Sequence, residues 1–176
     1  MHAATLTRPL TQTSTPLTFA AAAEQHLDDV FGYLLYLTRD RTLAEDLASE
    51  TFEKALRKWS RFDPRRGSAR TWLLALARST ALDWFRAESR RHRREEAAAQ
   101  PEAQEAEFVE GLSPALQTAL ATLSAGEREV LALRIVIELD GEQTARVLGI
   151  SPTAVSTRLS RALDKLEEKV RNDDLR

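Results

Sequence analysis

The sequence contains no cysteine and only three histidines, His2, His26 and His92. The absence of cysteine excludes disulfides, thiolate metal sites and cysteine nucleophiles. The three histidines are too scattered along the chain to predict a metal site or a catalytic relay. A glycine-rich phosphate-binding loop is also missing, as is the strand pattern that would hold one. We therefore expect a binding protein without a cofactor, and not an enzyme.

Long apolar runs are equally absent. No stretch approaches the roughly 20 apolar residues of a membrane-spanning helix. The opening residues MHAATLTRPLTQTSTPLTF have no continuous apolar segment typical of a signal peptide. We expect a soluble, cytoplasmic protein. Its hydrophobic content of 43% over 176 residues suffices for one medium core or two small ones.

Positive charge is concentrated between Arg57 and Arg94, in a chain whose net charge is -2. The acidic residues in this stretch are Asp63, Asp83 and Glu88, and the basic ones are Arg57, Lys58, Arg61, Arg65, Arg66, Arg70, Arg78, Arg86, Arg90, Arg91, Arg93 and Arg94. Aromatic side chains lie among them. This combination favours a phosphate backbone as the partner. The alternative is a solvated basic face of a helix.

The residues before this stretch predict two helices. Residues 1–18 are rich in threonine and proline, and we expect them to be disordered. Apolar residues recur with helical spacing from Phe19 to about Leu37. A second amphipathic helix follows, in which Thr42 and Glu45 have the spacing of a capping box. Its apolar side comprises Ala44, Leu47, Ala48, Phe52, Ala55, Leu56 and Trp59, and its exposed face comprises Glu45, Asp46, Ser49, Glu50 and Glu53.

Pro64 and Gly67 interrupt the helical pattern and predict a loop. A third helix is expected from about Ala69. Its buried stripe comprises Trp72, Leu73, Leu76, Ala77, Thr80, Ala81 and Trp84, and its outward residues are Arg70, Arg78, Asp83 and Arg86.

Residues 95–112 form an Ala/Glu/Gln tract that contains Pro101 and no basic residue. We interpret this tract as a flexible acidic linker between two domains, residues 19–94 and 113–171, with a tail at 172–176. The predicted fold class is all-α, with two small helical domains. The first has a three-helix core.

The second domain carries the signals of a helix-turn-helix. Ser113 with Pro114 marks a first helix start, and Ser124 with Glu127 forms a capping box for the next helix. The segment GEQTARVLGIS predicts a short helix closed by Gly149, and Ser151 with Pro152 begins a longer one. Two helices joined by a short turn with glycine are typical of DNA-binding domains.

The last helix divides into two faces. Its predicted inward residues are Val155, Leu159, Ala162, Leu163 and Leu166. Its outward residues are Thr153, Ser156, Thr157, Ser160 and Arg161, with Arg158 near the edge. Small hydroxyl and arginine side chains on one helix face suit a DNA major groove.

Four segments together resemble the extracytoplasmic-function (ECF) group of bacterial RNA polymerase sigma factors. They are AEDLASETFEKAL, FDPRRGSARTWLLALARSTALDWFR, GEREVLALR and ARVLGISPTAVSTRLSRAL. The similarity spans roughly residues 19–170. It implies a sigma domain 2 and a sigma domain 4, joined by the acidic linker, that direct core polymerase to promoters and help melt DNA.

The resemblance also implies roles for particular residues. Asp46, Ser49, Glu50 and Glu53 would bind the coiled coil of the polymerase β′ subunit, and the β subunit would be a second contact. The loop would hold a base flipped from the non-template strand of the −10 element, and the third helix would follow the adjoining duplex. The residues implied in this −10 contact are Phe62, Asp63, Arg65, Arg66, Ser68, Arg70, Arg78, Ser79, Asp83, Arg86 and Arg90. The −35 element would be read by Thr153, Ser156, Thr157, Arg158, Ser160 and Arg161. The family also allows an anti-sigma factor as a partner.

The chain departs from the family pattern at four positions. Ser49 stands where glutamine is usual, Ser79 where asparagine is common, and Ala154 and Ser156 replace a frequent threonine and lysine. Because Ser156 lacks the positive charge of lysine, we expect weak intrinsic −35 affinity.

Two other functions remain open at this stage. One is a stand-alone helix-turn-helix transcriptional regulator, which would bind duplex DNA tightly without polymerase. The other is an all-helical adaptor whose basic patch binds an acidic protein. The sigma-factor function further requires an accessible cleft beside Pro64 and Gly67.

Overall fold

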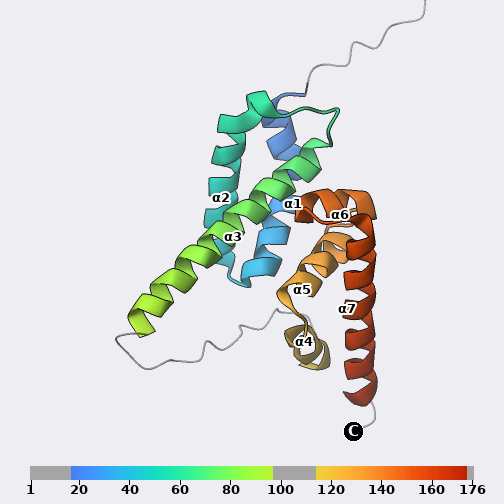
Figure 1. Cartoon of the computed structure of the whole chain (residues 1–176). Coiled ribbons are helices and arrows are strands. Elements are labelled where there is room, and N and C mark those ends of the chain that lie inside the picture. The colour runs from blue at the N-terminus through green and yellow to red at the C-terminus, as the bar shows by residue number, and fades with distance from the viewer. Residues whose placement is uncertain (1–16, 97–113, 174–176) are drawn as a thin grey trace, which may run out of the picture.

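The computed structural model describes residues 17–96 and 114–173, which form only helices, turns and loops (Figure 1). The elements in chain order are α1 (Phe19–Thr38), α2 (Arg41–Lys58), η1 (Trp59–Arg61), α3 (Ala69–Glu96), α4 (Pro114–Ala121), α5 (Ala125–Leu131), η2 (Ala132–Val136), α6 (Gly141–Leu148) and α7 (Pro152–Asp173). The predicted all-α fold is confirmed. We call residues 17–96 the first half and residues 114–173 the second half.

The three predicted non-helical segments, residues 1–18, 95–112 and 172–176, fall largely outside the described residues, as does the predicted cap at Ser113. Their described edges are ordered parts of helices. Thr18 caps α1 by accepting a hydrogen bond from the backbone N of Ala21, at 3.2 Å. Helix α3 continues through Glu96 and α7 through Asp173, each two residues beyond the predicted end.

Helix α2 begins earlier than the predicted cap at Thr42. Arg39 ends α1 in the left-handed conformation, with φ 55°, and Asp40 caps α2 by accepting from the backbone N of Leu43 at 3.0 Å. The predicted capping box at Thr42 is therefore wrong, because Thr42 already lies in the first turn of the helix. Asp40, directly after the left-handed Arg39, caps a helix at least as well as a threonine does. Because Asp40 precedes Thr42 in the chain, the helix begins there.

Local signals in the second half are confirmed. Ser124 and Glu127 form the predicted capping box at the start of α5. Gly149, with φ 65°, closes α6 and begins the turn to α7, where the Ser151 hydroxyl accepts from the backbone N of Ala154 at 3.1 Å. Asp140 and Gln143 form a second capping box, which the sequence analysis missed.

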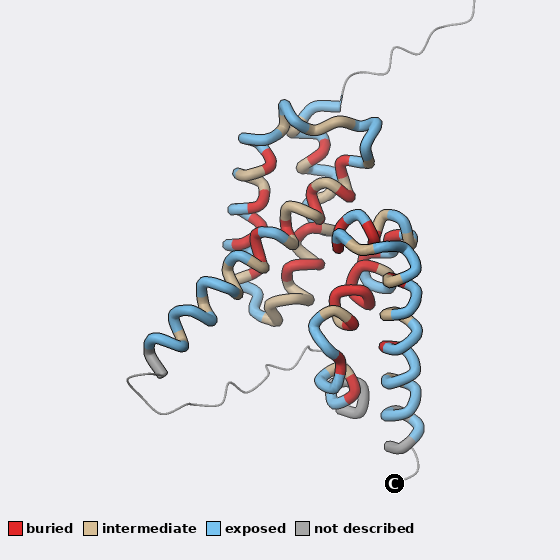
Figure 2. Tube along the Cα trace, viewed as in Figure 1, coloured by how far each residue is buried: buried red, intermediate tan, exposed pale blue. Residues whose placement is uncertain are grey.

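The core is continuous across both halves (Figure 2). Tyr33 and Leu34 of α1, Leu47 of α2 and Leu73 of α3 are fully or almost fully buried. The same cluster extends into the second half through Val130, Leu133, Ile137, Leu139, Val147, Leu148 and Val155. A smaller cluster of Leu123, Leu131 and Ala162 holds α7 against the helices before it.

Helix α3 buries residues on more than its predicted stripe. Leu73, Ala77, Thr80 and Ala81 are buried as expected, whereas Trp72, Leu76 and Trp84 are half-buried. Leu74, outside the predicted stripe, is also fully buried. Two other positions differ from prediction, because Leu56 is 59% exposed and Leu163 is 45% exposed instead of facing inward.

Candidate nucleic-acid interface

The loop from Phe62 to Ser68 is held by an internal ion pair. The Asp63 carboxylate accepts from Arg65 Nε at 3.0 Å, from Arg65 Nη2 at 3.2 Å and from the Arg65 backbone N at 3.0 Å. These hydrogen bonds lower the pKa of Asp63 below its usual range. Arg65 is exposed and its guanidinium is directed at this carboxylate, so the pair shapes the loop.

The aromatic rings of Trp59, Phe62 and Trp72 pack together beside the loop. The Trp59 ring stacks on Phe62, with 4.9 Å between centroids, and meets Trp72 edge-on at 5.7 Å. Phe62 and Trp72 are 5.5 Å apart in a tilted pair. All three are half-buried, so part of each ring surface borders solvent.

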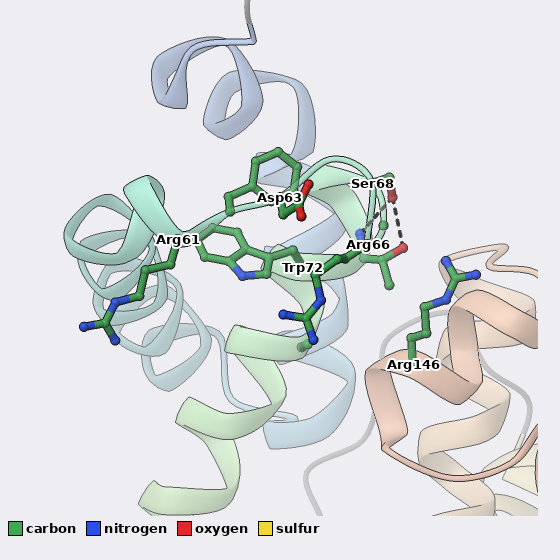
Figure 3. A pocket seen from close by; sticks show the side chains of 10 residues that line it. Arg61, Asp63, Arg66, Ser68, Trp72 and Arg146 are labelled. Atoms are coloured by element: carbon green, nitrogen blue, oxygen red, sulfur yellow. Dashed lines mark hydrogen bonds between the residues drawn. The ribbon is translucent and has the colours of Figure 1, made fainter.

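Of the cleft expected beside Pro64 and Gly67, the structure shows a cavity that Gly67 lines and Pro64 does not (Figure 3). A cavity of about 400 Å³ is lined by Arg61, Phe62, Asp63, Arg66, Gly67, Ser68, Thr71, Trp72, Ala75 and Arg146. The hydroxyls of Ser68 and Thr71 lie 3.0 Å apart at one end. Arg146 comes from α6, so the second half contributes one wall. Sequence analysis did not identify Arg146, since nothing local predicts that α6 lies against this loop.

Arg70 is engaged within the protein. Its Nε and Nη2 donate to the two Asp29 carboxylate oxygens of α1, both at 2.7 Å, and Nη2 also donates to the Ile137 carbonyl oxygen at 2.6 Å. The hydrogen bond from Arg70 lowers the pKa of Asp29 and raises that of Arg70 itself. Arg70 therefore ties α1 and α3 to the second half.

Arg78 links the two halves directly. Its Nε and Nη2 donate to the two Glu129 carboxylate oxygens of α5, at 3.0 and 3.1 Å. The buried Tyr33 hydroxyl donates to the same carboxylate at 3.5 Å. Burial, and then the negative charge of Glu129, raise the pKa of Tyr33 well above its usual value, so the phenol stays protonated. The prediction that Arg70 and Arg78 point outward is wrong, because each is satisfied by a carboxylate.

The remaining candidate residues of α3 lie on its exposed part. Ser79, Asp83, Arg86 and Arg90 are all exposed. Arg86 Nη1 pairs with Asp83 at 3.3 Å, and no described residue forms an ion pair with the Arg90 guanidinium. The C-terminal end of α3 extends away from the other helices (Figure 1). The −10 candidates thus divide into a loop group, two engaged arginines and an exposed group.

The acidic face of α2 is exposed as predicted. Asp46, Ser49, Glu50 and Glu53 are all exposed, and Glu50 and Glu53 pair with Lys54 and Arg57 one turn later, at 2.7 and 3.4 Å. Beside this face a groove of about 470 Å³ runs between α1 and α2. It is lined by Leu27, Asp28, Phe31, Arg41, Glu45, Ala48, Ser49 and Phe52.

The candidate face of α7 is also exposed. Thr153, Ser156, Thr157, Ser160 and Arg161 are all accessible, while Val155 and Ala162 on the opposite side are buried. Arg158 is half-buried and its guanidinium lies close to Gly126 of α5. The hydroxyls of Ser156 and Thr157 donate to backbone carbonyls one turn earlier, at 3.2 and 3.0 Å. A ligand can therefore approach along the whole first part of this helix.

Within residues 17–96 and 114–173, no group of histidine and acidic side chains is placed to hold a metal ion. No helix in the same ranges is long and apolar enough to cross a membrane.

Two family models match this chain. Sigma-70 region 2 matches residues 22–91, and Sigma-70 region 4 matches residues 113–166. The chain is 27% identical over 176 residues to the ECF RNA polymerase sigma factor SigX of Bacillus subtilis, covering 90% of each chain. It is 35% identical over 165 residues to the ECF RNA polymerase sigma factor SigC of Mycobacterium tuberculosis, covering 89% of this chain and 84% of that one.

A solved structure shares the fold. The sigma factor RpoE of Bartonella quintana, crystallised in complex with the anti-sigma factor NepR, superposes with a TM-score of 0.71 at 22% identity. The match covers 87% of this chain and 96% of RpoE.

Proposed function

The chain belongs to the ECF group of RNA polymerase sigma factors in the sigma-70 family, and we propose how its surfaces divide the recognition of a promoter. As a sigma factor it directs core polymerase to specific promoters at transcription initiation. In our proposal the first half binds polymerase and the −10 element, and the second half reads the −35 element. Neither role needs a catalytic residue, and both belong in the cytoplasm with core polymerase.

The polymerase contact is assigned to α2. Asp46, Ser49, Glu50 and Glu53 form an exposed, mostly acidic face, and a groove with apolar residues lies beside it. A basic coiled coil, such as that of the β′ subunit, complements this charge. Arg57 then exchanges Glu53 for solvent or for acidic groups of polymerase, which costs little because that pair is exposed. Lys54 is only 26% exposed and keeps its hydrogen bond to Thr80, at 3.3 Å, when it gives up Glu50.

The −10 contact is assigned to the loop and α3. The cavity beside Trp72 offers aromatic surface and hydroxyls to one unstacked base. Extruding a base from the duplex costs a few kcal/mol, which contacts in the pocket must offset. Phe62, Asp63, Arg65, Arg66 and Ser68 shape the pocket. Ser79, Asp83, Arg86 and Arg90 follow the adjoining strand along the exposed part of α3.

Arg78 joins this contact only after the halves separate, whereas Arg70 must also give up Asp29, a carboxylate of its own half. In the described arrangement Asp29 holds the Arg70 guanidinium and Glu129 holds that of Arg78. DNA phosphates would have to replace those carboxylates. We therefore assign this arrangement to the free protein. Polymerase, which binds each half at a different place, would supply the free energy of separation.

The −35 contact is assigned to the exposed face of α7, comprising Thr153, Ser156, Thr157, Ser160 and Arg161, together with the half-buried Arg158 at its edge. Few of these residues carry charge, so the affinity of this half alone is expected to be weak. Attachment to the first half and to polymerase raises its effective concentration at the promoter. An anti-sigma factor that covers the exposed faces of α2 and α7 would prevent both contacts.

The observation that carries the proposal is the cavity beside Trp72, which opens next to an arginine-bearing helix in the same half. The test is in vitro transcription with purified core polymerase on genomic fragments, followed by mapping of transcript starts. We expect starts that share one pair of upstream elements, and the loss of these transcripts when Arg66 and Arg90 are both replaced by alanine. Nanomolar binding to duplex DNA without polymerase, together with no specific transcript, would instead identify a stand-alone regulator.

A further inference from the structure

Lys54 of α2 contacts two surfaces that the proposed function treats separately. Its Nζ lies 2.7 Å from Glu50 Oε1, on the exposed acidic face of the same helix. The same Nζ donates a hydrogen bond to the hydroxyl of Thr80 in α3, at 3.3 Å. An ammonium group has three donor hydrogens, so one lysine serves both oxygens at once. Lys54 therefore connects the face assigned to polymerase with the helix assigned to the −10 element.

The two contacts of Lys54 differ in burial. The Glu50 side chain is 49% exposed, whereas Thr80 is 1% exposed. An exposed ion pair contributes little to stability, so a basic group of polymerase can take Glu50 at small cost. A buried hydroxyl without a partner is costly, and among the described residues only Lys54 forms a hydrogen bond with that of Thr80. Lys54 therefore stays with Thr80 when polymerase engages Glu50.

Thr80 lies at the point where α3 leaves the core. Ala81, the next residue, is the last buried one among the described side chains of this helix. Beyond it α3 extends away from the other helices (Figure 1). Ser79 and Asp83, two of the −10 candidates, are exposed on either side of this point. A change in the contact at Thr80 would therefore move the part of α3 that is assigned to DNA.

We propose that Lys54 positions α3 for the −10 element, by holding Thr80 while polymerase occupies Glu50. The inference rests on the proposed function and deepens it, because it joins two surfaces that were assigned independently. In this role Lys54 touches neither polymerase nor DNA. Without its ammonium group the Thr80 hydroxyl loses its partner, and the exposed part of α3 is no longer held at the angle that the promoter strand requires.

The test separates polymerase affinity from DNA affinity in two titrations. Each labelled full-length variant is titrated with core polymerase. Each reconstituted holoenzyme is then titrated with a fluorescent promoter fragment, chosen from the mapped transcript starts, that is single-stranded across the −10 element and duplex upstream of it.

Lys54→Met keeps the aliphatic stem and removes the ammonium group. It should weaken promoter-fragment binding by about five- to tenfold, as expected for one lost hydrogen bond from a charged donor. It should not weaken polymerase binding, because the acidic face stays intact. Wild-type affinity for the fragment would overturn the proposal. An equal loss of both affinities would also overturn it, because a merely structural role of Lys54 has that effect.

Arg57→Met is the matched control in the same helix. The Arg57 guanidinium pairs with Glu53 at 3.4 Å, but among the described residues it forms no hydrogen bond with α3. The variant loses the same charge as Lys54→Met and should bind the fragment as wild type does. Equal effects of the two variants would mean that only the overall charge matters, and would refute a positioning role.

Variants of Thr80 test the contact from the other side. Thr80→Val keeps the shape of the side chain and removes the hydroxyl, so it should weaken fragment binding as Lys54→Met does. The double variant should be no weaker than either single variant, because the two changes remove one and the same hydrogen bond. Thr80→Ser keeps the hydroxyl and should restore wild-type binding. Additive losses in the double variant would contradict a direct contact.

Two further variants distinguish failure of this inference from failure of the proposed function. Asp46→Lys should weaken polymerase binding, and the combined replacement of Arg66 and Arg90 by alanine should weaken fragment binding. If both do so while Lys54→Met matches wild type, only the role of Lys54 is overturned. If neither does so, the assignment of α2 and α3 is wrong and the inference falls with it.

Discussion

The two ends of α3 hold their arginines in different ways. Near its N-terminus Arg70 and Arg78 are about a quarter exposed, and each makes a two-pronged contact with a carboxylate. Toward the C-terminus Arg86 and Arg90 are exposed, and Arg86 has only a neighbour of the same helix as its partner. The comparison teaches that one basic helix serves two purposes. Its first part joins the halves, and its last part remains available to a ligand.

The largest effect is expected from the core under the N-terminal end of α3. Leu73 is fully buried, so Leu73→Ala should lower the free energy of unfolding by about 2 to 5 kcal/mol, through lost contacts and a residual cavity. Urea denaturation followed by circular dichroism measures this change. Arg90→Ala at the exposed end is the control and should stay within about 0.5 kcal/mol of wild type. Similar losses for both variants would erase the distinction between the two ends.

The next effect concerns the contact between the halves. Arg78→Ala leaves the Glu129 carboxylate buried with only the Tyr33 hydroxyl, and we expect a loss of about 2 to 3 kcal/mol, less than for a fully buried pair because water reaches Arg78. A double-mutant cycle with Glu129→Gln measures the coupling between the two side chains. Glu129→Gln should also increase binding to promoter DNA by freeing Arg78. A coupling energy near zero would mean that the contact does not join the halves in solution.

A smaller effect is expected at the exposed end. Arg86→Ala and Arg90→Ala should each weaken promoter complexes by roughly fivefold, regardless of the −10 sequence. Each should also reduce the slope of log affinity against log salt by about 1, as expected for one lost phosphate contact. Filter binding of holoenzyme over a salt series measures both quantities. By contrast, replacing Ser156 or Thr157 should change the preferred −35 sequence, and the reverse pattern would mean that the two elements are assigned to the wrong halves.

The smallest effect is expected at the ion pair of Glu127 and Lys165, which lies within the second half and not between the halves. Hydrogen bonds from Lys165 Nζ at 2.8 and 2.9 Å, and then the backbone N of Ser124, lower the pKa of Glu127 from 4.5 to about 2. A lowered folded-state pKa means that this stabilisation is complete above about pH 4.5 and is lost as the pH falls toward 2. Thermal melts from pH 6 to pH 2.5 should show a shallower acid decline for Glu127→Gln than for wild type. An unchanged decline would contradict a contribution from Glu127.

Structural features that depend only on residues close together in the chain were predicted correctly from the sequence. The capping box at Ser124, the left-handed Gly149 and the start of α7 at Ser151 all depend on hydrogen bonds between residues a few positions apart. The exposed faces of α2 and α7 followed from helical periodicity in the same way. Even here, the choice between Asp40 and Thr42 as the cap of α2 depended on the left-handed turn at Arg39. The spacing of residues in the sequence does not predict that turn.

Contacts between the halves were not predictable in this way. Leu74, Arg78 and Arg146 look like ordinary surface positions when each helix is considered alone, because periodicity describes only one buried face per helix. Arg78 pairs with Glu129 of α5, Arg146 lines the cavity beside the loop, and Leu74 belongs to the core cluster that spans both halves. A cleft beside Gly67 was expected, but neither the part of Trp72 in lining it nor the wall contributed by Arg146 was.

The turn η2 has a consequence for how the second half is oriented. In η2 the backbone N of Ile137 donates to the carbonyl of Ala132, five residues earlier, instead of to a carbonyl four residues earlier as in an α-helix. The turn therefore contains one extra residue. Ile135 and Val136 consequently face solvent. Since successive residues of an α-helix are about 100° apart, deletion of a single codon here would restore α-helical winding and rotate α6 and α7 about the axis of α5 by a similar angle. The orientation of α7, the helix proposed to read the −35 element, therefore depends on the one extra residue in this turn.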